Sequence, residues 1–100
     1  MHLARLWREH MAAGCPTELA GVEIAGSDAR VLDAEITACA SALICRRMTV
    51  DGRMERRLTE IRTALADKQA DTDEPVAAAY YARLNELVSA VLVESQSGQA

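Results

Sequence analysis

The side chains best suited to chemistry are an imidazole and a thiol near the amino terminus. His10 closes a predicted helix, and Cys15 begins the loop that follows it. A nearby base or positive charge makes a thiolate reactive, so this pair could support nucleophilic or redox chemistry. No Asn or Asp at a recognisable spacing completes such a site, and a packed His10 beside a small buried Cys15 is the alternative. The sequence therefore offers Cys15 as a reactive-thiol candidate and favours a protein without catalytic residues.

A second chemically capable group is a cluster of arginines in segment 46–62. A guanidinium binds phosphate through a planar fork, so a phosphate- or nucleic-acid-contacting regulator is one candidate function. The anion-binding candidates are Arg46, Arg53, Arg56 and Arg57. Two features disfavour nucleic acid: the formal net charge of the chain is −4, and segment 46–62 has no aromatic side chain to stack on bases. The alternative is a solvated face that pairs with acids on neighbouring helices or on a partner.

Neither a metal site nor a cofactor site is expected. The chain has no CxxC, HxxxH or ExxH spacing, and Cys39 and Cys45 would point about 120° apart on one helix. It also lacks a glycine-rich phosphate loop, a GxSxG motif and a pair of carboxylates forced together by spacing. A pocket inside a helical bundle remains a further possibility, because bundle cores house small molecules.

The composition is that of one globular domain. The chain has 100 residues, of which 50% are hydrophobic and 26% are charged. An odd number of cysteines does not suit a disulfide scaffold, and neither a secretory signal nor a long uncharged apolar stretch is evident. These features predict a cytoplasmic protein with reduced thiols and no membrane segment. The excess of Arg over Lys, with many Ala, is typical of a GC-rich bacterial genome.

Helical periodicity and punctuation residues predict an all-α fold, a small antiparallel bundle of three long helices plus a short N-terminal helix in a single domain. Expected N-caps are Ser27 or Asp28, Asp51, and Asp73 before Pro75. The stretch between Gly21 and Gly26 is too short for a sheet partner to be inferred and is expected to be an extended linker. The predicted elements are a short helix 2–13, a linker 14–27, helices 28–48, 52–70 and 75–95, and a flexible tail 96–100.

The middle and last helices have more apolar surface than such a bundle is expected to hide. Residues 38–45 are apolar or small on every side, and the apolar stripe of the last helix is wide. A large exposed apolar patch marks a partner site, unless the first helix with Trp7 folds over it. The interface candidates are Tyr81, Leu84, Val88, Val91 and Leu92, with Leu43 and Ile44 behind them.

The sequence therefore predicts a non-catalytic helical protein that acts by protein–protein association. A homodimer is the simplest assembly, and an adaptor or regulatory partner of another protein is the other form of the same hypothesis. The phosphate-contacting regulator and the small-molecule or thiol-dependent protein remain the alternatives.

Overall fold

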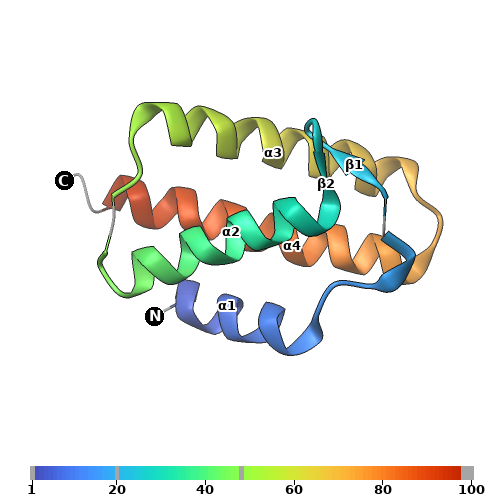
Figure 1. Ribbon diagram of the computed structural model, residues 1–100, viewed down its shortest axis with the longest axis horizontal. Coiled ribbons are helices and arrows are strands. Elements are labelled where there is room, and N and C mark those ends of the chain that lie inside the picture. Colours follow the sequence, from blue (N-terminus) through green and yellow to red (C-terminus); the bar gives the residue numbers. More distant parts are fainter. Residues whose placement is uncertain (1, 20, 48, 98–100) are drawn as a thin grey trace.

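The computed structural model describes residues 2–19, 21–47 and 49–97, and it confirms the all-α bundle. The helices run alternately along the long axis of the molecule (Figure 1). A 3-10 turn and a two-stranded hairpin complete the described structure. The elements are α1 (His2–Ala13), η1 (Thr17–Leu19), β1 (Glu23–Ile24), β2 (Ser27–Asp28), α2 (Ala29–Ile44), α3 (Gly52–Asp71) and α4 (Pro75–Ser97).

Helix α4 is the centre of the bundle, and α1, α2 and α3 all pack against it. Its wide apolar stripe is needed because three helices cover it from different sides. By length and composition alone, Pro75–Ser95 could also cross a membrane, but half of its most apolar window is buried inside the fold, as in the core helix of a bundle. Its buried side chains are Ala77, Tyr80, Tyr81, Leu84, Leu87, Val88, Ala90, Val91, Leu92 and Ser95.

Short polar side chains start the helices, mostly where the sequence predicts. The carboxylate of Asp28 accepts from the backbone N–H of Arg30 at 2.9 Å and begins α2. At the start of α4 the prediction of Asp73 is wrong. The Glu74 carboxylate instead accepts from the N–H groups of Val76 and Ala77, at 3.1 and 2.8 Å.

The Asp51 cap gives a first testable prediction. Its Oδ1 accepts from the backbone N–H of Met54 at 2.9 Å and so satisfies one free donor at the start of α3. Asp51→Ala should lower the free energy of unfolding by about 1 kcal/mol, measured by urea denaturation. Asp51→Asn keeps an acceptor oxygen and is the matched control. Equal losses in both variants would show that the cap bond adds nothing.

Helix α2 ends at Ile44, earlier than the predicted end at residue 48, which itself lies outside the described residues. The chain leaves the helix because Arg46 adopts a left-handed φ of 57°. The backbone N–H of Arg47 then closes the turn by donating to the carbonyl of Ala42 at 2.8 Å. The extra turn predicted for this helix therefore belongs to the α2–α3 connection.

The segment expected to be an unpaired linker contains a small hairpin. Strands β1 and β2 are antiparallel, with Glu23 opposite Asp28 and Ile24 opposite Ser27. The two turn residues, Ala25 and Gly26, have φ of 52° and 83°, so both occupy the left-handed region that a tight type I′ turn requires. Ala at the first position is unusual there, which is why the hairpin could not be predicted from the local residue types.

Candidate functional site

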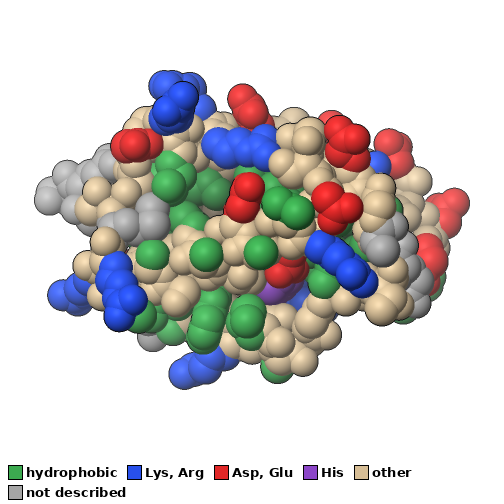
Figure 2. All heavy atoms as spheres, viewed as in Figure 1, with side chains coloured by type: hydrophobic (Ala, Val, Ile, Leu, Met, Phe, Trp, Pro, Cys, Tyr) green, Lys and Arg blue, Asp and Glu red, His purple; other side chains and the backbone are tan. Residues whose placement is uncertain are grey.

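A concave feature of the described structure lies between α2 and α3. Both helices pack on α4, but they come close to each other at hardly any point. The result is an open groove of about 640 Å³. Hydrophobic side chains follow it between α3 and α2 in the space-filling view (Figure 2). The lining residues are Glu35, Ile36, Ala38, Cys39, Asp51, Arg53, Met54, Arg57, Leu58 and Ile61.

The floor of the groove is apolar. Ile36, Leu58 and Ile61 lie at its base and belong to the buried core. At the α3 start, the Sγ of Cys39 lies 3.8 Å from the Sδ of Met54, so two soft side chains meet across the groove. Burial raises the pKa of the Cys39 thiol. Ile36, Leu58 and Ile61 are at most 4% exposed, so the partly buried Cys39 and Met54 supply the apolar surface that remains open to a bound molecule.

The α2 flank of the groove is apolar as well. Ala38 lines the groove and is exposed, and beyond the lining Val31 is 53% exposed and Ala34 is exposed too. Between residues 31 and 45 the only fully exposed charged side chain is Glu35, because the other acid of this segment, Asp33, contacts α1 and α4. A solvent-facing helix surface normally carries more charge than this.

Arg57, one of the anion-binding candidates, is used within the fold. Its Nη1 donates to the carbonyl of Ala25 at 2.8 Å, and its Nη2 donates to the Oγ of Ser27 at 3.1 Å. Nη1 also lies 3.9 Å from the carboxylate of Glu60. Arg57 therefore anchors the hairpin to α3, and most of its fork is not available for a phosphate.

We expect the Arg57 fork to stabilise the hairpin measurably. Arg57→Lys keeps the charge but cannot make both bonds from one planar group, so it should lower the free energy of unfolding by about 1–2 kcal/mol. Hydrogen exchange of the β1 and β2 amides should rise more than that of α4. Arg62→Lys, at an exposed position of the same helix, is the control. No local change in β1 and β2 would contradict this role.

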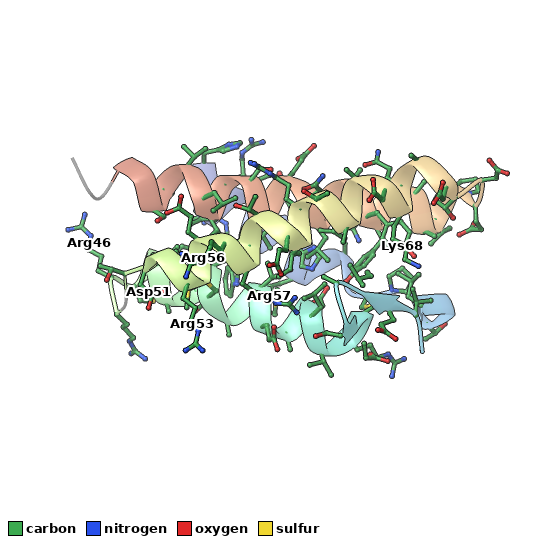
Figure 3. The ribbon with its side chains drawn as sticks, turned by 90° about the horizontal axis from the view of Figure 1, so that it is seen from above. Arg46, Asp51, Arg53, Arg56, Arg57 and Lys68 are labelled. Carbon is green, nitrogen blue, oxygen red and sulfur yellow. The ribbon has the colours of Figure 1, made fainter. Side chains whose placement is uncertain are left out.

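The remaining candidates of the arginine cluster do not form one compact patch. Arg53 and Arg56 lie on the first two turns of α3, whereas Arg46 lies apart in the α2–α3 connection (Figure 3). All three are exposed, and within the described residues none of them has a hydrogen bond or ion pair. Arg53 lines the groove together with Asp51 and Glu35, so its rim carries charges of both signs.

A buried polar network, not predicted from the sequence, joins three helices on the other side of α2. His10 Nε2 donates to Asp33 Oδ2 at 2.7 Å, and the Tyr80 hydroxyl donates to the same oxygen at 2.5 Å. Burial alone would raise the pKa of Asp33. The hydrogen bonds from His10 and Tyr80 and the charge of Arg83 lower this pKa by more than burial raises it, so the net shift is downward. Burial and the neighbouring Asp33 raise the pKa of Tyr80.

This network has the chemistry of a structural link. His10 is 2% exposed and Tyr80 is 0% exposed, so neither side chain reaches a solvent-borne substrate. His10 turns Nε2 to Asp33, and no described contact joins its ring to Cys15. The Cys15 thiol is half-buried and points to the carbonyl of Pro16, at 3.8 Å. The reactivity of Cys15 stays a prediction, but the structure does not place His10 as its base.

The five interface candidates on α4 belong to the core of the single chain. Tyr81 and Leu92 are 4% exposed, and Leu84, Val88 and Val91 are 0% exposed. The expectation that these side chains need a second copy to cover them is therefore wrong. The apolar face of α4 is covered more completely than the number of helices suggests, because α1, α2 and α3 all pack against it. Leu43 and Ile44 on α2 are partly buried against the same core.

Within the described part of the chain, no three His, Cys, Asp or Glu side chains come together as a metal-ligand set.

Comparisons with protein-family models, curated proteins and solved structures gave no match. The groove between α2 and α3, which was not predicted from the sequence, is the best candidate for a functional site. The signal for it was the run of small and apolar residues 38–45, part of the apolar surface that the bundle was not expected to hide.

Proposed function

We propose that the chain acts by protein–protein association, without catalysis, and that the α2–α3 groove receives an α-helix of the partner. The observation that carries this proposal is an open groove with a mainly apolar lining between two helices that do not close on each other. An amphipathic helix commonly lays its apolar face into such a groove. In this proposal, the excess apolar surface predicted from the sequence lies on α2 and not on α4.

The shape of the groove supports a helix as its occupant. The exposed residues of the α2 flank are mostly small, with Ala34 and Ala38 at its centre. Small side chains allow two helix backbones to approach closely, so a partner helix could lie deep enough to contact Met54 on the other wall. The charged rim would fix the orientation of that helix.

The proposal is tested by the size of the assembly in a lysate of the cells that make the protein. A tagged chain should elute from a sizing column well above its own 10.8 kDa. Ala38→Arg puts a large charge into the groove and should shift elution to the free chain. Ala66→Arg, at an exposed position of α3 away from the groove lining, is the control. Elution of the unmodified chain as a monomer would contradict the proposal.

A second candidate function is binding of an apolar small molecule with an acidic end. The volume of about 640 Å³ lies within the range of ligand sites. The Arg53 guanidinium at the rim could face such an acid. Native mass spectrometry of the gently purified chain distinguishes the two functions, because a resident small molecule adds a fixed mass that Ala38→Arg should remove.

A further inference from the structure

We infer that the helix in the groove is α2 of a second copy of this chain, packed antiparallel to the first across a two-fold axis near Ala38. This inference rests on the proposed function and names its partner. It differs from the interface predicted from the sequence, because it uses the outer flank of α2 and none of the buried residues of α4.

The first support is a stripe of residues on α2 with the spacing of a helix–helix seam. Its members recur in steps of four and three along the helix, which keeps them facing a neighbouring helix over several turns. All but one are apolar, and two of them, Glu35 and Ala38, line the groove. The stripe consists of Val31, Glu35, Ala38, Ala42 and Cys45.

A two-fold axis at Ala38 packs this flank of α2 against the same flank of the second copy. In the antiparallel arrangement Val31 of one copy lies opposite Cys45 of the other, Glu35 lies opposite Ser41, and Ala34 lies opposite Ala42. Each contact occurs twice, as an isologous interface requires. A parallel arrangement would instead bring the two Glu35 carboxylates together, and like charges at an interface are unfavourable.

Charge complementarity is the second support. Met54 contacts Cys39, so the first turn of α3, with Arg53, lies beside the carboxyl-terminal half of α2. The antiparallel pairing brings Glu35 of one copy to that same end of the other copy. Glu35 and Arg53 are both exposed, and neither has an ion pair within the described residues of its own chain. The second copy therefore supplies each of them with a counter-ion.

A charge-reversal cycle tests this pairing with the purified chain. Light scattering should give twice the chain mass of 10.8 kDa for the unmodified protein. Glu35→Arg and Arg53→Glu should each raise the dimer dissociation constant about tenfold, and the double variant should restore it to within about threefold. Glu86→Arg and Arg62→Glu, both at exposed positions outside the stripe and the groove lining, are the matched controls. Additive losses in the double variant would overturn the Glu35–Arg53 contact.

A cysteine placed on the two-fold axis tests the geometry directly. Ala38→Cys, in a Cys45→Ser background that removes the exposed native thiol, should form a covalent dimer on mild oxidation. Ala66→Cys in the same background should stay monomeric under the same conditions. Circular dichroism of each variant confirms that the helices are retained, so absence of the covalent dimer counts against the axis at Ala38.

Light scattering of the purified chain and the sizing column run on the lysate together separate this inference from the proposed function. A purified chain that stays monomeric at millimolar concentration overturns the second copy as partner. If the lysate assembly then still dissociates on Ala38→Arg, the groove binds a different protein and the proposed function stands. If the chain is monomeric in both settings, both proposals fail.

Discussion

Replacing Asp33 with alanine should lower the free energy of unfolding by about 2–5 kcal/mol at neutral pH. The Asp33 carboxylate accepts from His10 Nε2 at 2.7 Å and from the Tyr80 hydroxyl at 2.5 Å. Without it, two buried donors lose their acceptor, and each orphaned donor carries a desolvation penalty of about 1–3 kcal/mol. Guanidinium denaturation followed by circular dichroism measures the change.

The control for this prediction is Asp67→Ala, at an exposed position of α3, which should change stability by less than about 0.5 kcal/mol. Asp33→Asn retains the size of the side chain and one acceptor oxygen. Its loss of stability should lie between the losses of Asp33→Ala and Asp67→Ala. A loss for Asp33→Ala no larger than that for Asp67→Ala would show that the network does not stabilise the contact among α1, α2 and α4.

The same network gives stability a dependence on acid. The pKa of Asp33 lies below its ordinary value of 3.8 because the hydrogen bonds from His10 and Tyr80 outweigh the effect of burial. A carboxyl group with a lowered pKa stabilises the fold fully above its unfolded pKa, and this contribution is lost as pH falls through the folded pKa. The stability difference between the unmodified chain and Asp33→Asn should therefore shrink as pH falls from about 5 to about 3.

The helices were predictable because their signals are local. The apolar spacing of residues 2–13 and the caps at Asp28 and Asp51 are read within one or two turns of chain, and the structure confirms them. The errors fall where the backbone leaves the commonest conformations. The left-handed φ of Arg46 and of Ala25 has no residue signature, because Gly or Asn would be the usual choice at either place.

The candidate sites were harder to predict because they depend on distant contacts. Asp33 meets His10 across 23 residues and Tyr80 across 47. Nothing in the local pattern distinguishes Asp33 from a solvated acid such as Glu35. Similarly, the apolar periodicity of α4 shows that a face is buried but not by which chain, and only the convergence of three helices decides that question.

Leu84 provides the sharpest test of whether the apolar face of α4 is buried by its own chain or by a second copy. It is 0% exposed at the centre of α4, so Leu84→Ala should leave a cavity and lower the free energy of unfolding by about 2–5 kcal/mol. Tyr81→Arg should be more severe, because it would place a charged side chain at a position only 4% exposed, and we expect it to unfold most of the chain. Thermal unfolding followed by circular dichroism measures both effects.

Val93→Ala is the matched control on the same helix, because Val93 is 61% exposed, and it should change stability by less than about 0.5 kcal/mol. Protein concentration separates the core from an interface. Stability lost from a core does not depend on concentration, whereas stability lost from a dimer interface is recovered as concentration rises. If the loss of stability in Leu84→Ala disappears at high protein concentration, this face of α4 belongs to a dimer interface. A constant defect would leave the outer flank of α2 as the surface through which this chain associates.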